Sequence, residues 1–373
     1  MSSKPVQIPA PQALAFTLRQ QNLHRAKLTP LNAVRRMVAV QSQYDGSVPL
    51  ALWARCPGVA VDWVEQAIEK KRTLIKSWSL RMTLHVQAAE DWPLIVGAGG
   101  GPWLEWFYQG LSKWTGMQRG EITKRLNGIA RALKGQPRSR RALHERVPTL
   151  VSPDGSMWGY DVKGLAFRGE LLIVGREGAQ PVFAHREQWL ADQAWEPPAP
   201  EQALYELARR YLSAYGPASV QDFAHWSGLQ VKNGKKAFAG IADELVPVEV
   251  EGQRQPVFVL EQELNKLRRA GQDVPAVVLL PKFDVLLLAR KDKSWLVDDQ
   301  YYKRIHGKAG QVEAAVLLSG RAAATWRIKR GKTLIATVAP FTPLGKSAQK
   351  QVEREFSKLA HWLGSTDMRV EYS

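Results

Sequence analysis

The stretch that decides the fold is residues 201–260, EQALYELARRYLSAYGPASVQDFAHWSGLQVKNGKKAFAGIADELVPVEVEGQRQPVFVL. Residues 201–214 are strong helix formers whose apolar side chains recur at helical spacing. The run Tyr215-Gly216-Pro217 ends this helix, and Ser219 is suited to cap a second helix that runs to Trp226. A third helix fits residues 232–243. The first part of the stretch therefore predicts three consecutive helices.

Two strand-like runs complete the stretch. Residues 245–250 and 256–260 are rich in Val and flank the turn Glu251-Gly252-Gln253, so they predict a hairpin. Three helices followed by a two-stranded hairpin describe a winged helix, and the third helix of related helix-turn-helix units usually enters the DNA major groove. Here that helix carries Lys232, Lys235 and Lys236.

The same order of elements recurs twice before this stretch. We expect helices over residues 10–25, 30–41 and 61–72 with a hairpin over 74–87, and then helices over 119–134, 139–147 and 157–169 with a hairpin of 170–174 and 181–183 around the turn 175–178. The proline-rich linker 195–200 separates the second unit from the third.

Beyond Gly271 the chain becomes rich in strand-like runs, and a helix over 347–363 closes it. The runs are 274–281, 284–289, 294–297, 314–318, 323–328 and 333–338. The sequence therefore predicts an α+β protein of three tandem winged-helix units, followed by a strand-rich C-terminal region. We place the four regions at residues 1–95, 96–200, 201–270 and 271–373.

The charge balance points to a polyanionic partner. The 373 residues include 52 Lys and Arg against 35 Asp and Glu, which gives a formal net charge of +17. Nucleic acid is the commonest partner of such a chain, although a basic protein without one is the alternative. The single cysteine, Cys56, excludes an intramolecular disulfide. The N-terminus has no apolar signal core and no apolar run is long enough to span a bilayer, so we expect a cytoplasmic protein.

Several sequences approach a known cofactor or metal motif without completing it. The run Gly97-Ala98-Gly99-Gly100-Gly101-Pro102 has proline at the third glycine position of a dinucleotide fingerprint. Gly331-Lys332-Thr333 and Gly345-Lys346-Ser347 lack the earlier glycine of a phosphate-binding loop. His185-Arg186-Glu187 lacks the paired cysteines of zinc deaminases. We therefore expect no cofactor and no metal, and chemistry that relies on polar side chains and water.

The segment VAVQSQYDGSVPLALWARCPG, residues 38–58, resembles the AlkZ/YcaQ family of winged-helix DNA glycosylases. The family signature is Gln-x-Gln in the AlkZ branch and Gln-x-Asp in the YcaQ branch. Gln41-Ser42-Gln43 matches the first, and Gln43-Tyr44-Asp45 is the alternative match to the second. A Leu-Trp pair, here Leu52-Trp53, stands at the AlkZ-branch distance from Gln41, which favours Gln41 and Gln43. Ser42 departs from the usual apolar middle residue.

Other segments carry the resemblance along most of the chain. Residues 78–85, WSLRMTLH, are similar to the family's Trp-x-x-Arg-Gly-Thr-Leu-His segment, with Met82 in place of Gly. The remaining similar segments are 216–228, 280–284, 294–295 and 320–327. The resemblance implies three winged helices in a C-shaped arrangement around a basic channel, with two catalytic glutamines at its centre.

The implied activity is hydrolysis of the N-glycosidic bond of cationic N7- or N3-alkylated purines, extending to the unhooking of interstrand crosslinks. Such a base is already a good leaving group, so positioned amides and a water suffice without a strong acid. Residues two apart share a face on extended backbone but not on a helix, so we expect the helix to end near Gln41. Non-catalytic DNA binding, as in a transcription regulator, is the alternative.

The remaining candidate residues are expected to act on the DNA. Asp45 is either a structural cap or a second electrostatic partner of the sugar cation, and His85 is either a satisfied hairpin histidine or a DNA contact. Residues 301–308 mix aromatic and basic side chains between two predicted strands, which suits either a hairpin that probes a DNA groove or an exposed basic loop. The expected DNA-binding residues are Arg81, Thr83, His85, Arg168, Arg176, Lys282, Lys303, Arg304 and His306. We expect a monomer that binds duplex DNA containing alkylated or crosslinked purines, and associates with the nucleoid when it is bound.

Overall fold

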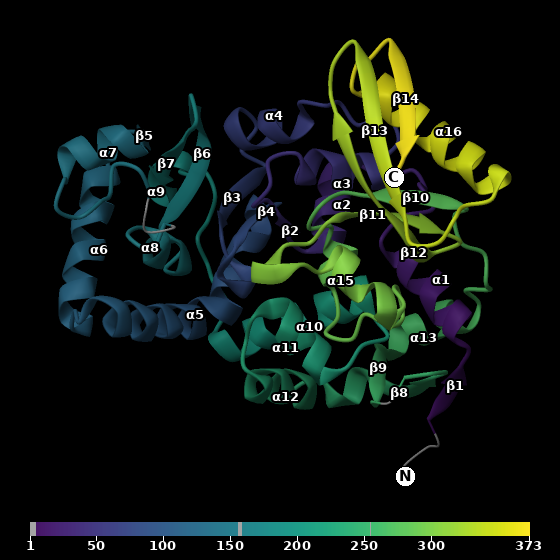
Figure 1. Ribbon diagram of the computed structural model, residues 1–373. Coiled ribbons are helices and arrows are strands. Elements are labelled where there is room, and N and C mark those ends of the chain that lie inside the picture. Colours follow the sequence, from purple (N-terminus) through teal and green to yellow (C-terminus); the bar gives the residue numbers. More distant parts are fainter. Residues whose placement is uncertain (1–4, 156–158, 254) are drawn as a thin grey trace. The chain divides into compact units, whose positions relative to one another are not determined.

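The chain folds into two compact units, each assembled from segments that are distant in the sequence (Figure 1). A computed structural model describes residues 5–155, 159–253 and 255–373. Unit 1 comprises Met1–Trp63, Arg209–Trp226 and Ile241–Ser373, and unit 2 comprises Val64–Ala208 and Ser227–Gly240. The mixed α+β class predicted from the sequence is confirmed.

Unit 1 contains most of the strands. Its elements are β1 (Val6–Ile8), α1 (Ala10–Gln20), α2 (Pro30–Met37), β2 (Val40–Gln41), α3 (Ser47–Arg55), η3 (Ala242–Glu244), β8 (Leu245–Val250), β9 (Val257–Leu260), α13 (Glu261–Arg268), β10 (Val277–Leu280), α14 (Val285–Leu288), η4 (Asp299–Tyr301), α15 (Tyr302–Ile305), η5 (Lys308–Gly310), β11 (Ala314–Leu318), β12 (Arg321–Lys329), β13 (Thr333–Pro340), α16 (Lys346–Trp362) and β14 (Asp367–Tyr372).

Unit 2 is mainly helical. Its elements are β3 (Leu74–Trp78), η1 (Leu80–Met82), β4 (Leu84–Ala88), η2 (Ala89–Asp91), α5 (Trp92–Thr115), α6 (Arg119–Leu133), β5 (Arg138–Ser139), α7 (Arg140–Arg146), α8 (Lys163–Phe167), β6 (Leu171–Glu177), β7 (Gln180–His185), α9 (Arg186–Trp189) and α12 (Val231–Ala239). The boundary between the units falls within α4 (Trp63–Glu69), α10 (Pro200–Tyr215) and α11 (Val220–Ser227).

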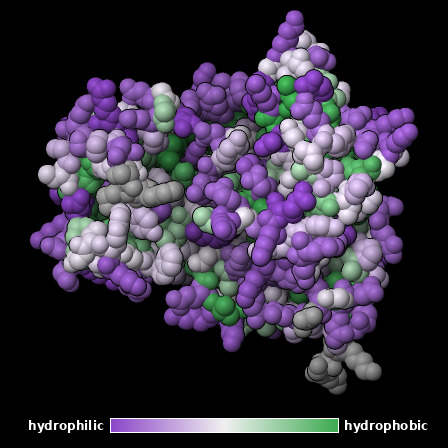
Figure 2. Space-filling view, viewed as in Figure 1, coloured by the Kyte–Doolittle hydropathy of each residue, from purple (hydrophilic) through white to green (hydrophobic). Residues whose placement is uncertain are grey.

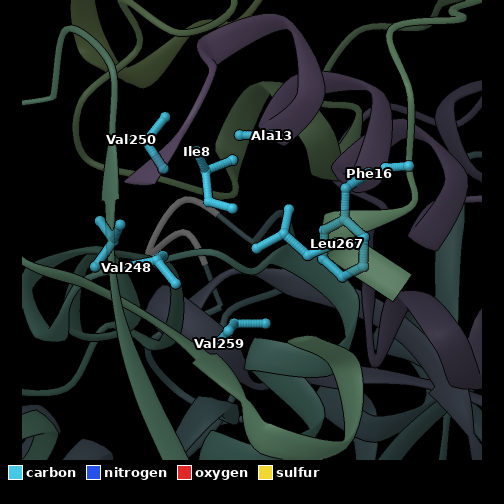
Figure 3. Close-up of a cluster of buried hydrophobic side chains, with 9 residues drawn as sticks. Ile8, Ala13, Phe16, Val248, Val250, Val259 and Leu267 are labelled. Carbon is cyan, nitrogen blue, oxygen red and sulfur yellow. The ribbon is translucent and has the colours of Figure 1, made fainter. Parts of the chain in front are cut away.

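The predicted β8–β9 hairpin gains a third strand from the N-terminus of the chain. Strand β1 pairs in parallel with β8, with Val6 opposite Val248, and β8 pairs antiparallel with β9. One face of this sheet buries an apolar cluster against α1 and α13 (Figure 3). The cluster consists of Ile8, Ala13, Phe16, Val248, Val250, Val257, Val259, Leu267 and Ala270. The sequence analysis missed β1, because three residues carry too little periodicity to identify a strand.

The C-terminal region forms a five-stranded sheet in the order β10-β11-β12-β13-β14. Pairing is antiparallel from β10 to β13, whereas β14 runs parallel to β13 because α16 provides the crossover between them. The strands expected at 284–289 and 294–297 are wrong: the first is the short helix α14 and the second is a turn. Asp284 ends the extended run, since its carboxylate accepts the Leu286 N–H at 2.9 Å and caps α14.

Helix α5 is the largest element that the sequence analysis missed. Its glycines and Pro102 weaken the helical signal in the sequence. At two of the glycines, however, neighbouring atoms leave no space for a side chain. A Cβ at Gly100 would lie 2.5 Å from the Phe167 carbonyl oxygen, and one at Gly99 would lie 2.2 Å from the Trp103 ring. The glycines therefore serve close packing. Within unit 2 the strands follow the order β4-β3-β6-β7-β5, which joins the two predicted hairpins in one sheet.

Two further boundaries differ from expectation. Strand β6 ends at Glu177 and strand β7 begins at Gln180, so the turn between them is shorter than the predicted turn over 175–178. Of the helix expected over 157–169, residues 157 and 158 lie outside the described residues, and α8 covers only Lys163–Phe167.

Hydrophilic side chains cover most of the face seen in Figure 2. In the described part of the chain, no helix combines the length and apolar character that crossing a bilayer requires.

A buried ion pair joins α3 to α14 within unit 1. The Arg55 Nη1 and Nη2 atoms donate to the two Asp284 carboxylate oxygens at 2.8 and 2.9 Å. Arg55 also donates to the Ala51 carbonyl oxygen at 3.1 Å, and both side chains are almost fully buried. Bidentate geometry and these additional bonds offset the cost of removing both charges from water.

We expect Arg55→Met to lower the free energy of unfolding by about 3–5 kcal/mol, because it leaves the Asp284 carboxylate buried without its counterion. Urea titration followed by circular dichroism measures the change. The control is Arg141→Met, which breaks a solvent-exposed pair with Glu145 and should change stability little. Equal effects of the two substitutions would contradict the assignment of Arg55 as a buried anchor.

Candidate functional site

A strained turn at Val38 separates helix α2 from the two candidate glutamines. Val38 has φ 66° and ψ −57°, and the Ala39 N–H donates to the Met37 carbonyl oxygen at 2.8 Å. These values define the γ-turn with positive φ, which is rare, and a β-branched residue adopts it only under strain. Val38 is buried, so the surrounding core holds it in this conformation. Strain of this kind is commonest at functional sites.

The γ-turn is followed by the short strand β2, which holds Gln41, and by a bend that holds Gln43. Helix α2 ends at Met37, four residues before Gln41, so the helix expected over 30–41 is shorter than predicted. Gln41 lies in β2, and its Nε2 donates to the Gln43 Oε1 at 3.3 Å. The side chain of Gln41 is only 4% exposed, whereas Gln43 is exposed. The two carboxamides therefore meet, with Gln41 at the end of β2 and Gln43 in the bend that follows.

The residues around the glutamines differ in their surroundings. Ser42 is buried, and its hydroxyl has no hydrogen-bond partner among the described residues. An apolar side chain would avoid that cost, which explains why serine is unusual at this position. Asp45 is exposed, and Gly46 rather than Asp45 is the N-cap residue of α3, where no side chain caps the helix. Asp45 therefore does not occupy the N-cap position of α3.

An aromatic ring that the sequence analysis did not single out lies beside the pair. Tyr44, directly after Gln43, is 53% exposed. The Lys282 Nζ lies 5.6 Å from the centre of its ring and donates to Glu313 at 3.0 Å. Lys282, predicted to bind DNA, thus has an intramolecular partner. The signal for Tyr44 was an aromatic residue within the polar run QSQYDGS.

The turn between β3 and β4 holds the predicted residues Arg81, Thr83 and His85. Arg81 and Met82 have φ of 52° and 56°, in the left-handed region that favours glycine. This backbone conformation explains why the similar family segment has Gly where this chain has Met82. A Cβ at Gly228 would lie only 2.5 Å from the Arg81 Cα, so that glycine permits a close approach within unit 2. The Thr83 hydroxyl donates to the Leu80 carbonyl oxygen.

His85 is a neutral, fully buried histidine. Its Nδ1–H donates to the Thr83 carbonyl oxygen at 3.0 Å, and its Nε2 accepts from the Arg81 Nη2 at 3.2 Å. Burial, reinforced by the positive charge of Arg81, lowers the pKa of His85 to about 3. Of the two interpretations of His85, the satisfied hairpin histidine fits these contacts, and the residue orients Arg81.

The other predicted DNA-binding residues have varied surroundings. Arg168 bonds to Glu170 and Asn127, and Arg176 is exposed at the end of β6. Lys303 and Arg304 are exposed on α15, and His306 stacks on Tyr302 with ring centres 4.7 Å apart. Of the two alternatives for residues 301–308, the hairpin is wrong, because these residues form η4 and the single-turn helix α15.

The site chemistry is that of neutral amides. Burial raises the pKa of the Cys56 thiol to about 11, so it is no thiolate nucleophile. Throughout the ranges 5–155, 159–253 and 255–373, the structure contains no group of three or more His, Cys, Asp or Glu side chains arranged to hold a metal ion.

The surroundings of His85 predict a pH dependence of stability. Because the pKa in the folded chain lies below the ordinary value of 6.5, the unfolded chain binds the proton first, and acid favours unfolding. The contribution of neutral His85 is complete above pH 6.5 and declines as the pH falls toward 3. Urea titrations at pH 7.5, 6.5 and 5.5 should show a steeper loss of stability in the wild type than in His85→Gln, by at most about 1.4 kcal/mol per pH unit. Identical slopes would rule out a buried neutral histidine at this position.

Comparisons with known proteins agree with the resemblance noted in the sequence. The sequence model of the family described as DNA glycosylase AlkZ-like matches residues 34–362. A protein of Streptomyces sahachiroi named interstrand DNA cross-link repair glycosylase is 27% identical over 369 residues, which cover 96% of this chain and 98% of that protein. The solved structure of the Streptomyces sahachiroi DNA glycosylase AlkZ superposes with a TM-score of 0.86 at 25% identity, covering 99% of this chain and 100% of the other. The chain therefore belongs to the AlkZ-like family of DNA glycosylases.

Proposed function

We propose that this glycosylase hydrolyses the N-glycosidic bond of cationic N7- or N3-alkylated purines in duplex DNA, and that its substrates include purines held in interstrand crosslinks. The observation that carries the proposal is the contact between the Gln41 and Gln43 carboxamides after helix α2 has ended, with an exposed aromatic residue next in the chain. The name of the Streptomyces sahachiroi relative, a cross-link repair glycosylase, supports the inclusion of crosslinks.

The two glutamines have unequal roles in the proposed mechanism. Gln41 is buried and donates one hydrogen bond to the Gln43 Oε1, so it acts as the positioning residue. Gln43 is exposed, and its oxygen can accept a second hydrogen bond from a water while its Nε2 donates to another oxygen. Gln43 therefore holds the attacking water against C1′ of the deoxyribose. The water oxygen bonds to C1′ as the bond from C1′ to the base nitrogen breaks. The base leaves with that electron pair as a neutral purine, and the proton lost by the water passes to the solvent.

Charge selects the substrate in this mechanism. An amide is not a base at neutral pH, so the pair contributes orientation and electrostatic stabilisation of the sugar cation rather than proton abstraction. An alkylated purine that already bears a positive charge leaves without protonation, whereas a normal purine must first be protonated, which a pair of amides cannot do. Asp45, exposed two residues after Gln43, is proposed as an auxiliary anion facing the sugar cation.

The finer architecture and the interaction with DNA are part of the same proposal. We propose that three winged-helix units form a C-shaped arrangement around a basic channel, and that the protein acts as a monomer on DNA of the nucleoid. The exposed cations Arg176, Lys303 and Arg304 are proposed phosphate contacts, and Arg81, Thr83 and Arg168 are proposed as further DNA contacts. A non-catalytic regulator is the second candidate, and base release distinguishes the two.

Duplex DNA with a single N7-methylguanine should release free base when the protein is in excess. We expect Gln43→Ala to slow this single-turnover reaction roughly 10²–10³-fold, because it removes the group that orients the water. Gln41→Ala should slow it less, and the double variant should abolish it. The released base is quantified by chromatography.

The control is Gln351→Ala on α16, which removes an exposed carboxamide of the same size. It should leave the rate unchanged. All variants should keep their affinity for undamaged duplex, and that affinity should fall steeply with salt, since phosphate contacts displace counterions. Release that persists in the double variant would disprove the assignment of the glutamines, and tight binding without any release would favour the regulator.

A further inference from the structure

Tyr44 is an exposed aromatic ring in the chain position next to the proposed catalytic pair. The Cα atoms of Gln43 and Tyr44 are about 3.8 Å apart, as in any trans peptide. Both residues lie in a bend of the chain and both are exposed, so the Tyr44 ring is a candidate surface for the base of a sugar held at Gln43. More than half of that side chain, 53%, is open to solvent, although a large apolar ring is ordinarily buried.

The Tyr44 ring is supported from within unit 1. The Lys282 Nζ lies 5.6 Å from the ring centre, within the range of a cation–π contact. Lys282 is held in turn by Glu313, whose carboxylate oxygens lie 3.0 and 2.9 Å from the same Nζ. Gly46 packs at the ring edge, since a Cβ there would lie 3.8 Å from the Tyr44 Cε1. The ring is thus held by neighbours while much of its surface remains available.

We propose that Tyr44 is the surface on which the alkylated purine stacks during excision, and that Lys282 and Glu313 position its ring. This inference rests on the proposed function. The face of an aromatic ring is negative, so it attracts a cationic purine more strongly than a neutral one. The carboxylate of Glu313 balances the charge of Lys282, so the ammonium supports the ring without opposing a second cation on the other side.

Stacking on Tyr44 would act on both recognition and rate. Holding the purine on the ring keeps C1′ against the water at Gln43, and the ring favours the charged base before the bond breaks. Selectivity for cationic lesions would then come from two sources, the leaving-group ability of the base and the ring that binds it.

The first test compares Tyr44→Leu with Tyr44→Phe in single-turnover release of N7-methylguanine. The quantity compared is the single-turnover rate constant divided by the dissociation constant of the DNA. Loss of one base–aromatic stack should lower it by about tenfold to a hundredfold in Tyr44→Leu, whereas Tyr44→Phe keeps the ring and should remain within about threefold of the wild type. The control is Trp114→Leu, which removes another exposed ring, 62% accessible on α5, and should change nothing. Equal loss in Tyr44→Leu and Tyr44→Phe, or no loss in either, overturns the proposal.

The second test asks which base the ring contacts. A duplex that carries a tetrahydrofuran abasic analogue lacks the lesion base but keeps its neighbours. If Tyr44 stacks on the lesion, Tyr44→Leu should bind this duplex as tightly as the wild type, while its affinity for the N7-methylguanine duplex falls. An equal loss for both duplexes would show that Tyr44 contacts a neighbouring base, and would overturn the assignment.

The third test addresses the role of Lys282 as a positioning residue. Lys282→Met should lower release of N7-methylguanine several-fold, and Lys282→Arg should restore it, because arginine keeps both the cation–π contact and the pair with Glu313. In a double-mutant cycle, Lys282→Met should have little further effect when Tyr44 is already leucine. Full additivity would show that Lys282 acts independently of the ring.

The outcomes distinguish failure of the stacking proposal from failure of the proposed function. If the wild-type protein releases no base, or if the Gln41→Ala/Gln43→Ala double variant remains active, the catalytic assignment itself fails. If the glutamine variants lose activity but Tyr44→Leu and Tyr44→Phe match the wild type, only the stacking proposal is wrong.

Discussion

The γ-turn at Val38 is the constraint on which the candidate site depends. The hydrogen bond from the Ala39 N–H to the Met37 carbonyl oxygen stops α2 and turns the chain into an extended segment. Had the helix continued, Gln41 and Gln43 would point to nearly opposite sides of it. The turn instead brings the two carboxamides within 3.3 Å of each other. The cost of a positive φ at a β-branched residue is offset by the burial of Val38 in the core.

Charge neutrality within the site matters as much as this geometry. The paired side chains are amides, which keep the same charge at every physiological pH. Within unit 1, the Lys282 ammonium at Tyr44 is balanced by Glu313. Within unit 2, burial keeps His85 neutral while it accepts a hydrogen bond from Arg81. A pair of amides fits a reaction whose leaving group already carries the charge that an acid would supply. Polarity and shape, rather than titration, then determine which base is excised.

Much of the fold could be predicted from the sequence, because long amphipathic helices and alternating strands carry strong periodic signals. Helices α6, α7, α10 and α16 and the β3–β4, β6–β7 and β8–β9 hairpins were predicted close to their observed bounds. The failures have local physical causes. Helix α5 is hidden by glycines that serve packing, and α14 by the cap and ion pair of Asp284. Strand β14 alternates polar and apolar residues, so its signal was present in the sequence and was overlooked.

The candidate site was predictable only in part. The resemblance of residues 38–58 indicated the glutamines, but their contact requires the Val38 turn, and nothing in the local sequence predicts a γ-turn at a valine. The long-range contacts of Lys282 and His85, and the exposure of Tyr44, arise from tertiary packing. Basic residues predicted as DNA contacts therefore include several that bond within the protein.

The most direct test of a catalytic pair made of neutral amides is the pH profile of the chemical step. Single-turnover release of N3-methyladenine, a cationic base without an acidic ring N–H, should be measured from pH 6.5 to 9 with protein in excess over DNA. Amide groups do not titrate in this range, so we expect the rate constant to stay constant within about twofold. A bell-shaped profile, or a tenfold change per pH unit on either side, would show that an ionising acid or base carries the reaction and would contradict this account.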